Sequence, residues 1–193
     1  MNGTVSERAR LDTTLYLVTD SSYHTEESFF RTVEAALQGG VTLLQLREKD
    51  KSAREYMELA GRVKKIADRY GVPLLIDDRV DVAAAVDAAG VHVGQSDIPV
   101  AAARKILGPD KIVGATAKTT KVKTILTKVS TLKEICETVP IPVNAIGGLN
   151  AGNVDVLDGA GIAGICVVSA IMKAEDPRET AEVLKKLAEK LKG

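Results

Sequence analysis

Residues 74–79 read Leu-Leu-Ile-Asp-Asp-Arg, an apolar run that changes at once to two acids and an arginine. A strand without polar alternation is typical of a parallel sheet that is buried on both faces. Residues 165–168, Ile-Cys-Val-Val, show the same feature near the other end of the chain. The stretch at 74–79 therefore predicts a parallel α/β fold with polar groups at the ends of buried strands.

Outward from this stretch, short β-branched runs alternate with longer amphipathic ones. We expect strands at residues 15–19, 41–47, 74–77, 90–93, 111–115, 143–146 and 164–168. Apolar spacing of three and four residues predicts helices at 26–38 and 53–70, and a proline near its start marks a third at 177–191. The alternation favours a TIM (βα)8 barrel or an open doubly wound sheet. No Gly-x-Gly-x-x-Gly follows the first strand, which counts against a dinucleotide site.

One region is too short for an eight-stranded barrel. About 30 residues separate the fifth strand from Val143, where two βα units need roughly 45 or more. Residues 121–129, Lys-Val-Lys-Thr-Ile-Leu-Thr-Lys-Val, resemble a broken piece of such a unit. Either a helix and much of the sixth strand are absent, or the sequence joins two segments across a gap. We expect a single barrel domain over 13–193, incomplete before its sixth strand, after a loose N-terminal tail at 1–12.

Composition narrows the class of protein. Lys plus Arg and Asp plus Glu both number 26, so the net charge gives no reason to expect nucleic acid or a membrane as partner. Cys136 and Cys166 lie in apolar stretches outside any metal pattern, which predicts reduced thiols in a cytoplasmic protein. No apolar run approaches the roughly 20 residues of a membrane span. The oligomeric state stays open, a homo-oligomer included.

Polar residues end the second strand, where residues 45–49 read Gln-Leu-Arg-Glu-Lys. Side chains alternate at period two, so Gln45, Arg47 and Lys49 point to one side, which in a barrel is the interior near the carboxyl-terminal mouth. Two cations and an amide there suit a phosphate or diphosphate, because buried charges need a partner. The simpler alternative is a solvated strand end in which Arg47 pairs with Glu48 or a neighbouring Asp.

Acidic residues follow the next two strands. Asp77 and Asp78 end the third strand, and Asp97 follows the fourth within Gly-Gln-Ser-Asp at 94–97. Adjacent parallel strands lie about 5 Å apart, so Asp78 and Asp97 can share one cation. Carboxylates combined with a substrate phosphate are the usual ligands of Mg²⁺ in proteins. Alternatively, Asp97 caps a helix, and Asp77 or Asp78 pairs with Arg79.

Small residues end the last two strands. Gly147 and Gly148 follow one of them, and Ser169 follows the other. Glycine lets a backbone approach an anion closely, and many barrels bind phosphate at their last two strands through backbone N–H groups. Taken alone, the two glycines can be explained as a tight turn and Ser169 as an ordinary N-cap. The occurrence of both features at the ends of the last two strands favours a phosphate site.

Neither histidine points to catalysis. His92 lies between Val91 and Val93 and points away from them, which is more typical of a satisfied core histidine than of a base. Neither His24 nor His92 belongs to a recognisable Ser/His/Asp or Cys/His arrangement. Lys49 could act as a Schiff-base lysine, but the nearby Arg47 suits a role for Lys49 in anion binding equally well.

The same segments resemble the thiamine phosphate synthase family. The matching stretches, in the family's order, are residues 15–20, 45–49, 78–83, 90–97, 145–148 and 168–171. The run Gly-Val-His-Val-Gly-Gln-Ser-Asp at 90–97, together with Gln-Leu-Arg-Glu-Lys, is the most specific part. The resemblance covers about residues 13–120 and 131–190.

That resemblance implies a reaction and its site residues. Hydroxymethylpyrimidine diphosphate would be joined to hydroxyethylthiazole phosphate with Mg²⁺ as cofactor, and pyrophosphate would be released through a pyrimidine cation. The implied contacts are Gln45, Arg47, Lys49, Asp77 and Thr116 for the pyrimidine substrate, Asp78 and Asp97 for Mg²⁺, and Gly148 and Ser169 for the thiazole phosphate. Of these, Arg47 and Lys49 would also be catalytic, because they would stabilise charge on the leaving group.

The chain departs from the family pattern at two places, and alternatives remain. Asp77 stands where the family usually has Asn, which removes an amide donor and adds charge. The family's Pro-Thr-x-Thr-Lys loop after the sixth strand has no counterpart, and its absence coincides with the short region. A thiazole tautomerase-like isomerase is one alternative, although Asp78 and Asp97 argue against it. A non-catalytic phosphate-binding barrel is the other.

Overall fold

The computed structural model describes residues 11–117 and 129–192. Its strands are β1 Leu15–Val18, β2 Leu43–Leu46, β3 Leu74–Asp77, β4 Gly90–Val93, β5 Ile112–Ala115, β6 Asn144–Ile146 and β7 Gly164–Val167. Its helices are η1 Ser21–Tyr23, α1 Glu26–Gln38, α2 Ala53–Arg69, α3 Val80–Ala85, α4 Val100–Leu107, α5 Val129–Thr138, η2 Val154–Leu157, α6 Ser169–Met172 and α7 Pro177–Leu191. The predicted strands differ from these bounds by at most two residues.

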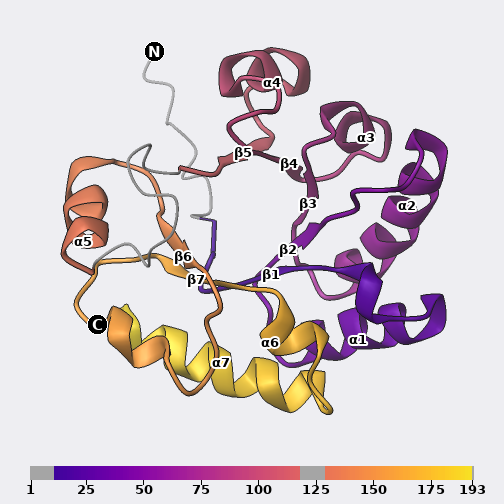
Figure 1. The fold of residues 1–193 in the computed structure, drawn as a ribbon. Helices are drawn as coiled ribbons and strands as arrows, with labels where there is room; N and C mark the ends of the chain where they lie inside the picture. The colour runs from indigo at the N-terminus through magenta and orange to yellow at the C-terminus, as the bar shows by residue number, and fades with distance from the viewer. Residues whose placement is uncertain (1–10, 118–128, 193) are drawn as a thin grey trace, which may run out of the picture.

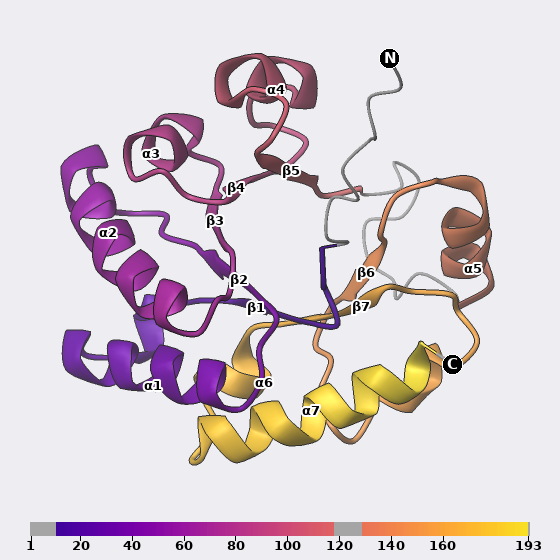
Figure 2. The ribbon, with the colours of Figure 1, turned by 180° about the vertical axis from the view of Figure 1, so that it is seen from behind.

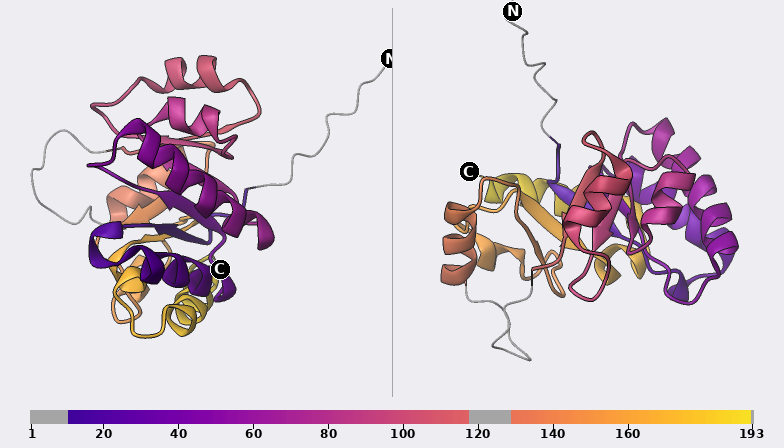
Figure 3. Two further views of the ribbon diagram at one scale, coloured as in Figure 1. Left: turned by 90° about the vertical axis from the view of Figure 1, so that its right-hand side faces the viewer. Right: turned by 90° about the horizontal axis from the view of Figure 1, so that it is seen from above.

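The strands of the described ranges form one parallel sheet in the order β5-β4-β3-β2-β1-β7-β6. The sheet curls, and the α-helices lie on its outer side (Figure 1), as the view from behind also shows (Figure 2). In the side view of Figure 3, α3 and α4 lie at the top of the curl, and α6 and α7 lie at the bottom. In the part of the chain that the structure describes, helices cover only one face of the sheet. This arrangement is typical of a TIM-like barrel, whereas a doubly wound sheet has helices on both faces.

Within the described ranges, 11–117 and 129–192, the barrel wall does not close. Strands β5 and β6 follow each other along the chain, yet they are the two edges of the sheet. A closed barrel would have a further strand between them. The prediction of a βα barrel that is incomplete before its sixth strand is therefore confirmed.

Local signals set the helix boundaries. Ser52 and Glu55 form a capping box at the start of α2, in which each side chain accepts from the other residue's backbone N–H. Asp176 caps α7 just before Pro177, and its Oδ1 accepts from Glu179 N at 3.0 Å. Such a cap satisfies an otherwise free N–H group and contributes about 1 kcal/mol. Helices α1 and α7 have the predicted bounds, and α2 ends one residue before the predicted end.

Alternation along the strands builds two apolar layers. Leu17 belongs to the large core between the sheet and the helices, whereas Tyr16 belongs to a smaller cluster inside the curl. Leu75 of β3 joins Tyr16 in the inner cluster, and burial of one such side chain contributes about 1.5–3 kcal/mol. Two residues further on, Asp77 has the same phase as Leu75, and Gln45 continues the inner phase on β2. The side chains of Asp77 and Gln45 therefore point into the barrel.

The predicted tail and broken segment are described only in part. Residues 1–10 lie outside the described ranges, as does all of the segment at 121–129 except Val129, which begins α5. Leu11 and Asp12, the last two residues of the predicted tail, contact the barrel. Leu11 packs against the inner cluster, and Asp12 Oδ1 accepts from Thr14 N at 2.9 Å.

Both cysteines are free, as predicted. Cys166 is buried in the inner cluster, where burial raises the pKa of its thiol to about 12, and Cys136 is half-buried. Within the described ranges, no helix has the length and apolar character needed to cross a membrane.

Candidate active site

Charged side chains meet at the carboxyl-terminal ends of β1, β2 and β3. Arg47 Nε lies 3.7 Å from Asp77 Oδ2, and Lys49 Nζ lies 3.2 Å from the same oxygen. Lys49 Nζ is also 2.5 Å from Asp78 Oδ2, and Arg47 Nη1 is 4.0 Å from Asp20 Oδ2. Two cations and three carboxylates thus form one continuous set of ion pairs, which we call the mouth cluster.

Burial differs sharply within the mouth cluster. Asp77 is 8% exposed, whereas the side chains of Arg47 and Lys49 are 39% and 48% exposed. The hydrogen bond to Asp78 raises the pKa of Lys49, partial burial opposes the rise, and the bond to Asp77 adds to it. Lys49 is therefore held in its charged form, and the side chains of Arg47 and Lys49 lie partly exposed above one shared, buried carboxylate. The pairing of Arg47 with acids also agrees with the simpler alternative for this strand end.

Gln45 lies deeper than the two cations on the same strand. It is 3% exposed, and its Nε2 donates to Tyr16 Oη at 2.5 Å. Burial raises the pKa of Tyr16, so its phenol is neutral. The amide predicted to accompany Arg47 and Lys49 is thus held by a tyrosine of β1 inside the curl.

Asp78 and Asp97 lie at neighbouring strand ends. Asp78 has φ +60°, and its N–H donates to His92 O at 2.8 Å. Asp97 Oδ2 accepts from Gly94 N at 2.7 Å. Asp77 is in register with His92, so β3 and β4 end near each other. Asp78 directly follows β3, and Gly94 directly follows β4. A Cβ at Gly94 would lie 2.7 Å from Asp97 Oδ2, so glycine is what allows the carboxylate this close approach.

The simpler alternatives for these acids do not hold. Arg79 Nε donates to Asp81 Oδ1 at 2.9 Å, and the partner of Asp78 is Lys49. Helix α4 has Pro99 as its N-cap residue, without a side-chain cap, so Asp97 does not cap it.

His92 links the inside of the barrel to Thr116. Its Nε2 lies 2.8 Å from Thr116 Oγ1, just after β5. His92 is in register with Gly114 of β5, where a Cβ would lie 2.8 Å from the ring Nδ1. Burial lowers the pKa of His92, although Asp77, Asp78 and Asp97 oppose this shift. His92 is thus a neutral, hydrogen-bonded histidine, as the sequence predicts.

Backbone groups and one hydroxyl occupy the ends of β6 and β7. Gly147 has φ +139° and Gly148 has φ +64°, a region that glycine enters readily. Gly148 O accepts from Asn153 Nδ2 at 3.0 Å. Ser169 is exposed and is the first residue of α6. Since β6 pairs with β7, Gly148 and Ser169 follow adjacent strand ends, on the same edge of the sheet as the mouth cluster.

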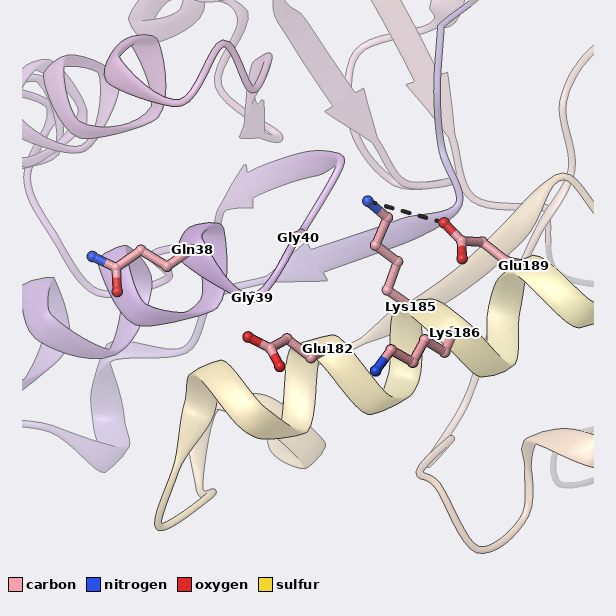
Figure 4. A pocket seen from close by; sticks show the side chains of 7 residues that line it. All are labelled: Gln38, Gly39, Gly40, Glu182, Lys185, Lys186 and Glu189. Atoms are coloured by element: carbon pink, nitrogen blue, oxygen red, sulfur yellow. Dashed lines mark ion pairs between the residues drawn. The ribbon is translucent and has the colours of Figure 1, made fainter.

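A separate hollow of about 340 Å³ lies far from these residues, between the end of α1 and α7 (Figure 4). Its lining includes Gly40, which precedes β2, so it opens at the amino-terminal edge of the sheet. It is shallow, and Lys185 Nζ lies 4.0 Å from Glu189 Oε1 within it. This hollow is not part of the candidate site.

Two residues of the site were not singled out by the sequence analysis. Asp20 directly follows the predicted strand at residues 15–19, just as Asp78 directly follows the predicted strand at residues 74–77. Tyr16 carries a hydroxyl inside an otherwise aliphatic strand, and its phase places that hydroxyl inside the barrel.

Comparison with known proteins identifies the family. A family model described as thiamine monophosphate synthase matches residues 15–125 and 118–171. The chain belongs to the thiamine monophosphate synthase family. The family assignment confirms the resemblance seen in the strand-end motifs, and with it an enzyme of the transferase class in thiamine biosynthesis.

Relatives in the thiamine monophosphate synthase family match most of the chain. Thiamine-phosphate synthase 2 of Streptococcus pneumoniae serotype 4 is 49% identical over 198 residues, which cover 90% of this chain and 94% of the relative. The thiamine-phosphate synthase of Lacticaseibacillus paracasei is 43% identical, over 90% and 93%. The solved structure of thiamine phosphate pyrophosphorylase from Pyrococcus furiosus has a TM-score of 0.85 and 34% identity, over 95% of this chain and 99% of that one.

The streptococcal thiamine monophosphate synthase also bears on the open edge of the sheet. Because 90% of 193 residues is about 174, an alignment over 198 positions includes about 24 at which the relative has a residue and this chain has none. About 24 residues approach the length of one strand–helix unit of such a barrel. The number of unmatched positions agrees with the predicted shortfall of residues for a complete barrel.

Proposed function

We propose that the chain joins hydroxymethylpyrimidine diphosphate to hydroxyethylthiazole phosphate in a Mg²⁺-dependent reaction that yields thiamine phosphate and pyrophosphate. One observation carries the proposal. Arg47 and Lys49 converge on a single buried carboxylate oxygen at the carboxyl-terminal mouth of a barrel whose relatives are named thiamine-phosphate synthases. That mouth is where enzymes of this fold hold their substrates.

Arg47 and Lys49 stabilise the leaving group in this proposal. The bond that breaks joins the methylene carbon of the pyrimidine to a diphosphate oxygen, and its electron pair leaves with pyrophosphate. The resonance-stabilised pyrimidine cation is then attacked at this carbon by the thiazole nitrogen. Cationic groups aimed at the charge that grows on the leaving oxygen lower this barrier, so the protein needs no covalent nucleophile.

Asp78 and Asp97 fit the ligand set of a magnesium ion. Both are carboxylates at adjacent strand ends, and hydrogen bonding to Gly94 N fixes the position of Asp97. No group of three or more His, Cys, Asp or Glu residues suited to a metal occurs among the described residues. Two carboxylates plus substrate phosphates are a typical Mg²⁺ environment. When bound, the ion would neutralise charge on the diphosphate.

The remaining residues position the two substrates. Gln45, Asp77 and Thr116 line the inner wall and would contact the pyrimidine substrate. Gly148 and Ser169 would bind the thiazole phosphate through backbone N–H and hydroxyl groups. Alignment of two bound reactants replaces a bimolecular encounter and accounts for a large share of such a rate enhancement.

Pyrophosphate release on addition of both substrates and Mg²⁺ tests the proposed function. The unchanged chain should release pyrophosphate and form thiamine phosphate in equal amounts. Lys49→Gln should lower kcat by about 10²-fold or more, as expected for a lost charge-stabilising donor. Lys64→Gln, which removes the half-buried partner of the exposed Asp68 on α2, is the matched control and should leave kcat unchanged. Absence of product with the unchanged chain would exclude the synthase function.

A phosphate-binding barrel without turnover is the second candidate, because about 24 positions of the streptococcal relative have no counterpart here. Isothermal titration with the pyrimidine diphosphate separates the two functions. Mg²⁺-dependent binding without product formation would favour the binding module. None of the relatives reported above is named as an isomerase, so the tautomerase-like alternative has no support from them.

A further inference from the structure

We infer that Asp77 is a built-in counter-ion that makes anion binding at the mouth cluster depend on a divalent cation. The inference rests on the proposed function, because it concerns the same anion-binding groups. Asp77 is 8% exposed, and its Oδ2 lies within 3.7 Å of Arg47 Nε and 3.2 Å of Lys49 Nζ. One buried carboxylate therefore engages both cations before any ligand arrives.

The formal charge of the mouth cluster opposes a free anion. Arg47 and Lys49 supply two positive charges, and Asp20, Asp77 and Asp78 supply three negative ones, all connected by N–O distances of 4.0 Å or less. The cluster therefore has a formal net charge of −1. A diphosphate adds further negative charge, so without a cation it meets repulsion from the carboxylates as well as attraction to Arg47 and Lys49.

Asp77 is held in place by the barrel. It is the last residue of β3, it is in register with His92 of β4, and its backbone O accepts from Tyr56 Oη at 3.4 Å. Tyr56 is itself only 1% exposed. An incoming anion therefore has to compete with a fixed carboxylate for Arg47 and Lys49.

Asp78 couples the cation requirement to Lys49. Asp78 Oδ2 is 2.5 Å from Lys49 Nζ, so the lysine is held by two acids at once. When Asp78 engages a divalent cation, it attracts the ammonium group less strongly, which leaves Lys49 more available to a phosphate oxygen. The same cation changes the net formal charge of the cluster from −1 to +1. Both effects favour anion binding only when the metal is present.

Isothermal titration of pyrophosphate into the full chain at low ionic strength tests this inference. The unchanged chain should bind pyrophosphate about 100-fold more tightly with Mg²⁺ than with a chelator, because the cation reverses the sign of the site charge. Asp77→Asn keeps the side-chain shape and removes one negative charge. It should raise the metal-free affinity about tenfold and reduce the Mg²⁺ enhancement by the same factor.

Asp87→Asn is the matched control, because it makes the same chemical change at a distant ion pair. Asp87 Oδ1 is 2.5 Å from Lys111 Nζ, and both residues precede their strands, β4 and β5. This variant should bind pyrophosphate as the unchanged chain does, with and without Mg²⁺.

Three results overturn the inference. The first is equal affinity of the unchanged chain with and without Mg²⁺, which needs no variant. The second is an Asp77→Asn chain, with an unchanged circular dichroism spectrum, that binds metal-free pyrophosphate no more tightly. The third is an Asp77→Asn chain that binds more weakly in both conditions, which would make Asp77 a positioning group. If the unchanged chain binds no pyrophosphate in either condition, the proposed function fails as well. If the unchanged chain binds pyrophosphate normally and Asp77→Asn does not alter this binding, only the present inference fails.

Discussion

His92 Nε2 lies 2.8 Å from Thr116 Oγ1, so a ring inside the barrel fixes a hydroxyl group at its mouth. The ring is positioned in turn by Tyr16, whose ring centroid is 6.5 Å away in an edge-on arrangement, and by the space over Gly114. Burial lowers the pKa of His92, which keeps the imidazole neutral. We therefore expect His92 to act on turnover through Thr116, as a positioning residue.

A double-mutant cycle on His92 and Thr116 checks this coupling. Thr116→Ala and His92→Leu should each lower kcat/KM about five- to tenfold, because each removes a hydrogen bond worth about 1 kcal/mol. The double variant should lose no more than either single variant, since His92 has no hydroxyl left to position. Steady-state pyrophosphate release measures all four chains.

His92→Gln is the conservative control, because its amide nitrogen can still bond to the Thr116 hydroxyl. It should recover most of the lost kcat/KM in the Thr116 background and none in the Thr116→Ala background. Additive losses in the cycle, or equal losses for the Gln and Leu variants, would show that His92 serves only the fold.

Replacement of Asp97 tests the metal site. Asp97→Ala should raise the Mg²⁺ concentration for half-maximal turnover at least tenfold, because loss of even an indirect metal contact typically costs about 10- to 100-fold in affinity. A Mg²⁺ titration of the initial rate measures the effect. Asp97→Asn retains an oxygen that can accept from Gly94 N, so it separates the lost charge from the lost loop contact.

Asp68→Ala serves as the control for Asp97, since Asp68 is an exposed partner of Lys64 on α2. Its Mg²⁺ requirement should equal that of the unchanged chain. An Asp97→Ala chain with a normal rate at limiting Mg²⁺ would remove Asp97 from the metal site.

Much of the fold and the edge of the site could be predicted from local sequence patterns. In 74–79, three apolar residues define a buried strand, and the acids directly after them define its carboxyl end. Parallel strands bring all such ends to one edge, so the grouping of Arg47, Lys49 and Asp78 follows from topology alone.

The partners within the site could not be predicted, because they depend on three-dimensional register. Whether Asp78 pairs with Arg79 or Lys49 depends on loop geometry after β3, where Asp78 has φ +60°. The depth of Gln45 and its bond to Tyr16 depend on the pairing of β1 with β2, which no single strand encodes.

Replacement of Gly90 and of Gly61 by alanine should have opposite effects on the stability of the fold. A Cβ at Gly90 would lie 2.0 Å from Ile112 O, so Gly90→Ala forces β4 away from β5. It should lower the free energy of unfolding by about 3 kcal/mol or more. Gly61 lies inside α2, and an added Cβ would meet nothing within 4 Å beyond the neighbouring backbone of its own helix. Gly61→Ala should therefore raise the free energy of unfolding by about 0.5–1 kcal/mol. Urea unfolding measures both, and a neutral Gly90→Ala chain would contradict the close strand contact.

Glu48 should make stability depend on pH. Its Oε2 accepts from Ser21 Oγ at 2.8 Å, and its Oε1 is buried without a hydrogen-bond partner in the described ranges. Burial raises the pKa of Glu48 above its ordinary value, so the folded chain binds this proton more readily than the unfolded chain does. Because its pKa is raised on folding, ionised Glu48 destabilises the fold at any pH above the pKa that it has in the folded chain. This cost disappears as the pH falls below the pKa of the unfolded chain, about 4.3.

Glu48→Gln removes this buried charge and should raise the free energy of unfolding near pH 7 by about 1 kcal/mol, the order expected for relief of an unsatisfied buried acceptor. The gain should shrink as the pH approaches about 4, because the native glutamate is then protonated and equally neutral. Urea unfolding at a series of pH values measures the difference between the two chains. Glu58→Gln, at an exposed position of α2, should give no such trend. A gain for Glu48→Gln that stayed constant from pH 4 to pH 8 would mean that packing or hydrogen bonding, and not the charge of Glu48, sets the difference.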